Sequence, residues 1–306
     1  MPPDGPFHAG EVAAQTLAGV ASRGAGIRNF MPDQHRIFFG QLPWLFAGVL
    51  GRDGWPLATV LAAGPGFVAS PSPTTLSVAA LPSGADPAFE SFRPDSPIGL
   101  LGLEFETRRR NRANGRIEAI GADGFSTSVT QSFGNCAKYI QVRNRARDGN
   151  EPAAASVSLS GLDPAARALT AAADTLLIAS AAALDSETGG VDISHRGGRP
   201  GFVRVDGATL TIPDFPGNRY FNTLGNLALE PKAALLFVDF RTGGLLHLNG
   251  EVEIIWDLAG MRAPLGAERL WRFTVTRAWR RANALPLHWD FGTYAPTTER
   301  TGLWAA

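Results

Sequence analysis

The chain has 306 residues, of which 28 are basic and 28 are acidic, so its formal net charge at pH 7 is zero. This balance argues against nucleic acid as a partner, and the single Cys136 excludes an internal disulfide framework and any paired-cysteine metal or redox site. No run approaches the roughly 18 apolar residues that a membrane helix needs, and the N-terminus lacks a basic segment followed by an apolar one. We therefore expect a cytoplasmic protein with two domains and no contact with a membrane.

The first half of the sequence predicts two short helices followed by β-strands. Pro32 with Asp33 is typical of a helix start, and apolar residues at helical spacing place helices at 7–20 and 32–42. Runs rich in apolar residues then predict strands, at 45–51, 56–63, 74–80, 98–106 and 116–122. A helical turn is expected at 86–92, and the arginine-rich stretch 107–115 (TRRRNRANG) is expected to separate the last two strands.

The second half of the sequence repeats this order of elements. A polar, alanine-rich segment begins at Asp148, where we place the boundary between domains 1–147 and 148–306. Strands are expected at 174–183, 189–198, 201–214, 233–240, 245–255 and 269–279. A helix is expected at 218–230, with Asn218 as its N-cap and Pro231 as its stop. Several short strands around one helix in each half favour two small antiparallel barrels.

The two halves also share sequence. The tetrapeptide PGFV occurs at 65–68 and again at 200–203, which is 135 positions later. The same shift aligns 99–120 with 234–255 and places the dipeptide Asn114-Gly115 on Asn249-Gly250. Because unselected parts of the chain align at one shift, we interpret the chain as a tandem duplication.

Three segments carry a resemblance to a known family. The segment 194–240, which contains SHRGGRPGFVRV and TLTIPDFPGNRYFNTLGNLALEPKAALLFVDF, resembles the pyridoxamine 5'-phosphate oxidase-like family of FMN-binding split barrels. MPDQHRIFF and QSFGNCAKYIQVR resemble a subgroup of flavin-nucleotide-binding proteins with a tandem arrangement. The resemblance covers nearly the whole chain. It implies a mainly β fold with flanking helices, in which tandem split β-barrels form an internal pseudo-dimer and hold a flavin in the groove between them.

The second copy carries features that a flavin phosphate requires. A phosphate dianion needs fixed positive charge and free backbone N–H groups, and a helix start beside an arginine supplies both. At the predicted helix start, Gly217 allows close approach of the backbone, Asn218 begins the helix and Arg219 offers a fork of donors.

The resemblance implies further contacts from the second copy. Arg196 would join Arg219 at the phosphate, and Thr223 lies one helical turn beyond Arg219. The remaining implied contacts run beside the isoalloxazine ring and are Ser194, His195 and Gly197. His195 alternates with Ile193 along the strand and could equally face a core.

The first copy lacks a counterpart of PGNRYFN, so its phosphate site is expected to be lost. It carries instead a basic stretch at the strand that crosses to the other barrel. We expect a contribution to the flavin from Arg109, Arg110, Asn111 and Arg112. Neighbouring arginines repel one another unless an anion lies near, although a hairpin turn in water is the alternative. The hypothesis is one composite site per chain, with Arg219 and Arg110 lining a common cavity.

The resemblance implies an FMN-dependent oxidoreductase that acts on a small molecule, with a nicotinamide as one candidate donor and FAD as an alternative flavin. Pyridoxamine phosphate oxidation itself is not favoured, because the C-terminal motif of that enzyme is not reproduced in 273–289. A flavin carrier without turnover and a haem-binding split barrel are the alternatives. No catalytic residue is assigned, and Cys136 is interpreted as a packing residue beside Tyr139. An exposed barrel edge makes pairing into a homodimer a further expectation.

No metal site is predicted. The histidines outside the proposed flavin site have no metal-ligand spacing, and they are His8, His35, His247 and His288.

Overall fold

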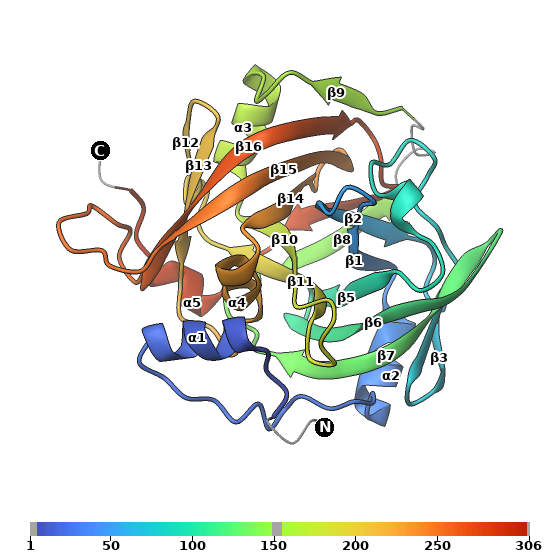
Figure 1. The fold of residues 1–306 in the computed structure, drawn as a ribbon. Coiled ribbons are helices and arrows are strands. Elements are labelled where there is room, and N and C mark those ends of the chain that lie inside the picture. Colours follow the sequence, from blue (N-terminus) through green and yellow to red (C-terminus); the bar gives the residue numbers. More distant parts are fainter. Residues whose placement is uncertain (1–4, 149–154, 305–306) are drawn as a thin grey trace.

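The computed structural model describes residues 5–148 and 155–304 and contains two large antiparallel sheets (Figure 1). The first sheet has the strand order β2-β1-β5-β6-β7-β4-β3. Its strands are β1 (Trp44–Leu50), β2 (Pro56–Ala62), β3 (Val68–Ser72), β4 (Thr75–Val78), β5 (Pro97–Glu104), β6 (Arg109–Gly121) and β7 (Gly124–Asn135). All of these strands come from the first half of the chain.

The second sheet has the strand order β11-β10-β14-β15-β16-β13-β12, with β9 beside β16. Its strands are β9 (Val157–Leu159), β10 (Thr175–Ala182), β11 (Gly190–Gly197), β12 (Arg204–Asp206), β13 (Thr209–Asp214), β14 (Lys232–Asp239), β15 (Gly244–Ile255) and β16 (Arg269–Arg281). The two sheets have the same strand order, because each strand of the first sheet, β1 to β7, has its counterpart nine strands later, in β10 to β16. The fold is therefore mainly β and consists of two copies of one antiparallel barrel in tandem.

A β-bulge falls at the same place in both copies. The register between β6 and β7 shifts at Asn114/Gly115, and the register between β15 and β16 shifts at Asn249/Gly250. A Cβ atom on Gly115 would lie 1.9 Å from the carbonyl oxygen of Ser128, and one on Gly250 would lie 2.3 Å from that of Thr274. Only glycine fits at these bulges, which explains why the Asn-Gly dipeptide recurs in the sequence.

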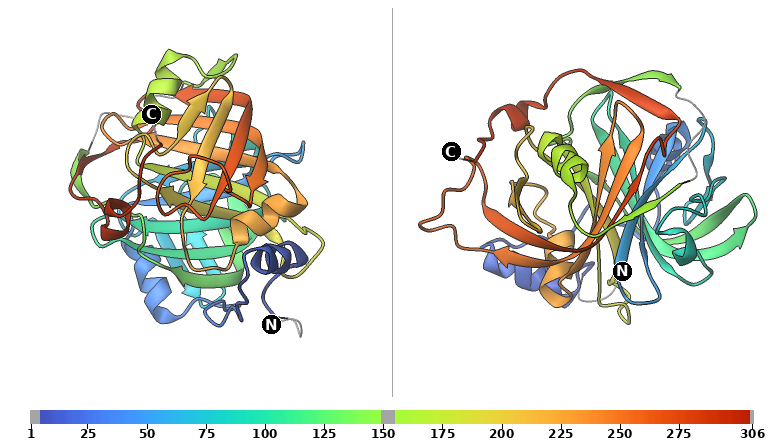
Figure 2. Two further views of the ribbon diagram at one scale, coloured as in Figure 1. Left: turned by 90° about the vertical axis from the view of Figure 1, so that its left-hand side faces the viewer. Right: turned by 90° about the horizontal axis from the view of Figure 1, so that it is seen from above.

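Helices flank the two sheets and close their ends. They are α1 (Ala9–Leu17), α2 (Asp33–Gln41), the 3-10 turn η1 (Phe89–Ser91), α3 (Pro164–Ala172), α4 (Asn222–Leu229) and α5 (Pro296–Glu299). Helix α1 begins the chain but packs against α4 of the second copy, as both views in Figure 2 show. None of the helices in the described part of the chain has the length and hydropathy to span a bilayer.

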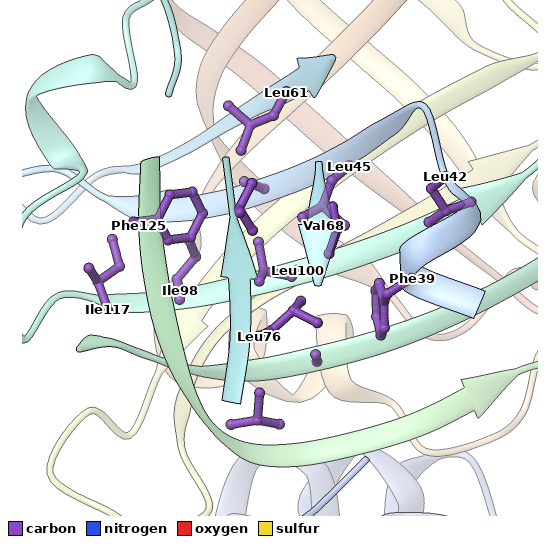
Figure 3. Close-up of a cluster of buried hydrophobic side chains, with 14 of the residues drawn as sticks. Phe39, Leu42, Leu45, Leu61, Val68, Leu76, Ile98, Leu100, Ile117 and Phe125 are labelled. Atoms are coloured by element: carbon purple, nitrogen blue, oxygen red, sulfur yellow. The ribbon is translucent and has the colours of Figure 1, made fainter. Parts of the chain in front are cut away.

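Three hydrophobic clusters hold the molecule together. One lies inside the first barrel, where Leu45, Leu100 and Phe125 meet (Figure 3), and a similar cluster fills the second barrel. The third cluster lies between the barrels. Strand β10 shows how one strand serves two clusters, because Ile178 faces the core of its own barrel while Leu177 faces the other half. This alternation explains why β10 is apolar along its whole length and buried throughout.

A short two-stranded sheet joins the end of the first copy to the end of the second. Strand β8 (Arg143–Asp148) pairs with β17 (Leu287–Phe291), and Trp289 stacks on Trp44 with 3.9 Å between the ring centroids. The boundary that we place near Asp148 falls at the end of β8. Residues 149–154 of the predicted polar segment lie outside the described residues.

Several predicted elements differ from the structure. The predicted strand 201–214 consists of two strands, β12 and β13, and the sequence did not predict β3 and β7. The stretch 107–115 is not only a connection, because β6 begins at Arg109 and carries the arginines within the sheet. The predicted helix 218–230 begins at Asn222, and its N-cap position is held by Phe221 with a φ of 63° instead of by Asn218. Residues 215–221 run as a loop before the helix, so the backbone N–H groups near Asn218 do not form a helix start.

Candidate functional site

A cavity of about 60 Å³ lies between the two halves of the molecule. Polar side chains from both copies line most of it. The first copy contributes Leu101 of β5, Arg110 and Arg112 of β6 and Asn135 of β7. The second copy contributes Ser194, His195 and Arg196 of β11, Gly217 and Asn218 of the loop, and Phe221, Asn222 and Thr223 around the start of α4.

Strand geometry divides the four predicted residues of the first copy into two pairs. Successive side chains of a strand point to opposite faces of the sheet. Arg110 and Arg112 point toward the second copy and line the cavity. Arg109 lies over the ring of Phe38, with 4.8 Å between its guanidinium carbon and the ring centroid, and Asn111 is buried on the same face. The structure therefore places Arg109 and Asn111 away from the cavity.

Arg112 is held by a carboxylate of the second copy. Its Nη1 donates to Oδ1 of Asp192 at 2.8 Å, and its Nη2 donates to the hydroxyl of Ser194. Asn114 donates to the same Oδ1 of Asp192 at 2.7 Å. Burial lowers the pKa of Arg112, whereas Asp192 opposes this shift. Arg112 therefore fixes the two halves to each other at the floor of the cavity.

Arg110 has no such partner. Its Nη1 donates to Nδ1 of His195 at 3.1 Å, and its Nη2 lies 3.6 Å from the sulfur of Cys136. Among residues 5–148 and 155–304, no carboxylate lies within ion-pair distance of Arg110. Burial lowers the pKa of Arg110, Cys136 opposes this shift, and the positive charges of Arg196 and Arg112 add to it. Arg110 is a half-buried cation that no carboxylate of the described residues neutralises.

His195 lies beside Arg110 and is 3% exposed. Burial and the charges of Arg110 and Arg196 hold the pKa of His195 well below its usual value, so the ring is neutral at pH 7. Since Nδ1 accepts a hydrogen bond from Arg110, the proton of the neutral ring belongs on Nε2. This Nε2 is buried and has no partner.

His195 is one of several cavity residues with a buried nitrogen atom that has no hydrogen-bond partner in the described part of the chain. These atoms are Nε of Arg110, Nε of Arg112, Nε of Arg196, Nδ2 of Asn135 and Nε2 of His195. Each of them is a donor in the protonation states given above. A buried donor without an acceptor costs free energy. These nitrogen atoms therefore favour the binding of a ligand with several acceptor oxygens.

Arg219 is a correction to the sequence hypothesis. It does not line the cavity that contains Arg110, so the expected common cavity of these two arginines is not found. Its backbone is left-handed, with a φ of 63°, and its side chain lines two adjacent hollows with Arg269 and Glu268. Arg196 lines both the cavity and one of these hollows, and it lies 3.7 Å from Asp214. Of the two arginines that the sequence hypothesis places at the phosphate, Arg196 lines this cavity and Arg219 does not.

The other predicted residues of the second copy are placed as follows. Thr223 is buried and its hydroxyl donates to that of Ser194 at 2.9 Å. Asn218 lines the cavity and donates to Oδ1 of Asn135 at 3.4 Å. Gly197 does not line the cavity, but a Cβ atom there would lie 2.1 Å from the carbonyl oxygen of Tyr139, so it is a point of close backbone approach. In the described part of the chain, no cluster of His, Cys, Asp or Glu is arranged to hold a metal ion.

Sequence reasoning missed several residues of the site, among them Asn135 and Asp192. Asn135 lies next to Cys136, and its role depends on the end of β7 reaching the cavity. Asp192 lies two residues before Ser194, on the same face of β11, and this period of two is the signal that could have found it.

Comparison with known proteins places the chain far from characterised ones. No family model and no curated protein matches the sequence. Solved structures that are similar include a putative pyridoxamine 5'-phosphate oxidase from Lactobacillus delbrueckii, with 14% identity and a TM-score of 0.28, covering 35% of this chain and 95% of its own. A FAD-binding protein from Mesorhizobium loti has 15% identity and a TM-score of 0.30, with coverages of 42% and 97%.

The haem storage protein HutZ from Vibrio cholerae is also similar, with 12% identity, a TM-score of 0.27 and coverages of 40% and 95%. Each of these proteins spans less than half of the present chain. The likeness is distant, and the architecture described above follows from the strand order of the chain itself.

Proposed function

We propose that the chain binds a flavin nucleotide, FMN, with its phosphate in the cavity between the two copies, and that it is a flavin-dependent oxidoreductase. The observation that carries this proposal is Arg110, a half-buried cation with no carboxylate partner among the described residues, beside buried donors that lack acceptors. A phosphate dianion supplies the missing charge and several acceptor oxygens. The volume of the cavity is of the scale of one phosphate-sized group.

The residues of both copies have distinct tasks in this proposal. Arg110 and Arg196 would supply the positive charge, and Asn135 and His195 would donate hydrogen bonds to the oxygens of the phosphate. Arg112 is already engaged by Asp192 and keeps the two halves in register. A bound flavin would supply the electron or hydride transfer, whereas the protein would supply position, charge and exclusion of water. The same donors would suit the phosphates of FAD.

The tautomer of His195 argues against haem. A histidine binds iron through a nitrogen that carries a lone pair and no proton. In His195 the lone pair is on Nδ1, where it accepts from Arg110, and Nε2 carries the proton. The buried ring is therefore set up as a hydrogen-bond donor to a ligand, which favours a flavin nucleotide over haem.

Titration of the purified protein with FMN tests the proposal, with the quenching of flavin fluorescence as the readout. Arg110→Gln is expected to weaken binding by roughly 10- to 100-fold, because a charge-assisted hydrogen bond contributes about 1.5–3 kcal/mol. Arg109→Gln is the matched control, since Arg109 is the neighbouring residue and faces away from the cavity. Equal affinity of the Arg110 variant and the native chain would overturn the assignment.

Absorption spectra separate the remaining alternatives. A Soret band in the purified protein would replace the flavin proposal by a haem one. If FMN is bound, bleaching of its visible bands by NADH or NADPH supports a reductase that uses a nicotinamide donor. If the protein binds flavin but neither a nicotinamide nor another small-molecule donor reduces it, the chain is a flavin carrier.

A further inference from the structure

The duplication predicts a second cavity, related to the first by the exchange of the two copies. The cavity described above lies where β11 of the second copy meets β6 and β7 of the first. The counterpart lies where β2 of the first copy meets β15 of the second, next to β16, and β2 and β15 are also in contact. The strand registers give the counterpart of each residue. Ser194 corresponds to Thr59, His195 to Val60, Arg110 to Leu245, Arg112 to His247 and Asn135 to Arg281.

The counterpart position is occupied by a side chain of the protein. Oδ2 of Asp86 accepts from the hydroxyl of Thr59 at 2.6 Å and from Nη1 of Arg281 at 2.5 Å. Oδ1 of Asp86 accepts from the backbone N–H of Ala88 at 2.9 Å. Nη2 of Arg281 donates to the hydroxyl of Ser83 at 2.5 Å. Asp86 and Arg281 are each 4% exposed, so this is a buried ion pair that joins the two copies.

The two positions differ in what satisfies their donors. In the open cavity, Nδ2 of Asn135 is a buried donor without a partner. At the counterpart, Arg281 stands in the place of Asn135 and donates to a carboxylate. Ser194 lines the open cavity, and its counterpart Thr59 donates to the same carboxylate. The carboxylate of Asp86 thus occupies the place at which the open cavity would hold an anion.

We propose that Asp86 is a built-in substitute for a bound anion, so that the chain has one open anion site and one that it fills itself. The rest of the counterpart agrees with this assignment. Val60 and Leu245 replace His195 and Arg110 and belong to the hydrophobic cluster between the barrels. Nδ1 of His247 donates a hydrogen bond to the carbonyl oxygen of Ala58 at 3.0 Å. The counterpart position thus retains only the groups that contact one small anion, Thr59 and Arg281. Without the side chain of Asp86, this position would bind a small carboxylate or oxyanion and exclude a nucleotide.

Chemical rescue of Asp86→Ala tests this inference. Removal of the carboxylate leaves the buried guanidinium of Arg281 without its partner, and we expect the Tm to fall by about 10 °C. Sodium formate, acetate or inorganic phosphate should restore a large part of this loss, whereas sodium chloride at equal ionic strength should not. The control is Asp163→Ala. Asp163 binds Arg280 at 2.8 Å through both carboxylate oxygens, but this pair is partly exposed, so its loss should show no rescue by these anions.

Two further variants keep the test decisive. Asp86→Asn keeps the shape of the side chain and serves if the alanine variant does not fold; formate should raise its Tm less than that of Asp86→Ala, because the amide still fills the position. In Asp86→Ala combined with Arg281→Gln, rescue should disappear because the cation is gone. The inference would be overturned if Asp86→Ala folds but formate and phosphate raise its Tm no more than they raise the Tm of the native chain.

The inference stands apart from the flavin proposal. Phosphate binding can be counted by calorimetry, and we expect one more site in Asp86→Ala than in the native chain. If the native chain binds no phosphate and the variant binds one, the flavin proposal fails while the role of Asp86 holds. If the native chain binds one phosphate and the variant binds no more, the role of Asp86 fails while the open cavity stands.

Discussion

Glu11 shows how strongly burial acts on a single carboxyl group of this protein. It belongs to α1, is 3% exposed, and accepts from the backbone N–H of His8 at 2.9 Å and from the side chain of Asn222. Burial, followed by the negative charge of Asp192, raises the pKa of Glu11 to about 8, while Arg112 and the hydrogen bonds act in the opposite direction. The group is therefore mostly protonated in the folded protein at neutral pH.

This raised pKa predicts a loss of stability as the pH increases. The ordinary pKa of the group is 4.5, so between pH 4.5 and about 8 the unfolded chain has released a proton that the folded chain still binds. The free energy of unfolding then falls with rising pH, by at most about 5 kcal/mol from this group. Urea denaturation at pH 5 and pH 9 measures the effect. Glu11→Gln should show a flatter pH dependence than the native chain, and Glu90→Gln, at an exposed site, should not. Parallel pH curves for the native chain and Glu11→Gln would contradict the assignment.

At the scale of the element, a bulge lies opposite Asn114 and Gly115, in β7, the strand beside the one that carries Arg110 and Arg112. Asn114 pairs with Gln131 and Gly115 pairs with Val129, so Thr130 is the extra residue. A β-bulge bends its strand and increases the local twist. The β6–β7 pair is therefore distorted just beyond Arg112.

Substitution of the glycine in this bulge should therefore destabilise the fold. In Gly115→Ala the new Cβ atom would meet the carbonyl oxygen of Ser128 at 1.9 Å, which only a backbone shift can relieve. We expect a loss of about 1–3 kcal/mol in the free energy of unfolding, measured by urea denaturation. Gly121→Ala is the matched control in the same strand, because nothing lies within 4 Å of its Cβ position. Equal stability of the two variants would show that the bulge does not require glycine.

The elements also show what the sequence could and could not predict. Most strands of the two sheets were predicted because short apolar runs between turn residues are a local signal, as in β10 and β14. Strands β3 and β7 were missed because both are rich in serine or threonine and lack an apolar run. The start of α4 was misplaced by four residues, because Asn218 has the chemistry of an N-cap but its side chain instead accepts from the backbone N–H of Tyr220 at 3.2 Å. The packing of α1 on α4 gives no local signal, since the two helices are far apart in the sequence.

The candidate site was predictable to a similar extent. The basic stretch around Arg110 and the polar run at Ser194 stand out in the sequence, and the structure brings them together. Asp192 shares a strand face with Ser194, but its partner Arg112 belongs to the other copy. The partner of Asp86, Arg281, also belongs to the other copy, so the sequence does not reveal either pair. Such pairs depend on how the two barrels are docked, which no local pattern encodes.

At the scale of the whole molecule, small residues let the two barrels approach closely. Gly48 pairs with Gly99 across β1 and β5, and Ala179 pairs with Ala234 at the corresponding place in the second copy. A Cβ atom on Gly48 would lie 3.1 Å from the Cβ atom of Ala179, so these two pairs face each other across the boundary. The site depends on this approach, because the cavity takes its lining from both barrels.

Gly99→Ala should therefore affect both stability and ligand binding. Its Cβ atom would lie 2.6 Å from the carbonyl oxygen of Val191 and 3.1 Å from the backbone of Asp192, whose side chain holds Arg112. Displacement of β11 should cost about 1–3 kcal/mol in the free energy of unfolding and should weaken the binding of FMN, although Gly99 does not line the cavity. Urea denaturation and flavin titration of the same preparation measure the two effects.

The control for this variant is Gly64→Ala, in an exposed loop where nothing lies within 4 Å of the Cβ position, and it should behave as the native chain does. A Gly99→Ala protein of native stability would mean that the barrels can separate slightly without strain. If stability falls while FMN affinity stays unchanged, the cavity does not depend on the spacing of the barrels, and the composite character of the site is wrong. If both fall together, the docking of the two copies is what creates the site, because Gly99 itself contributes no contact to it.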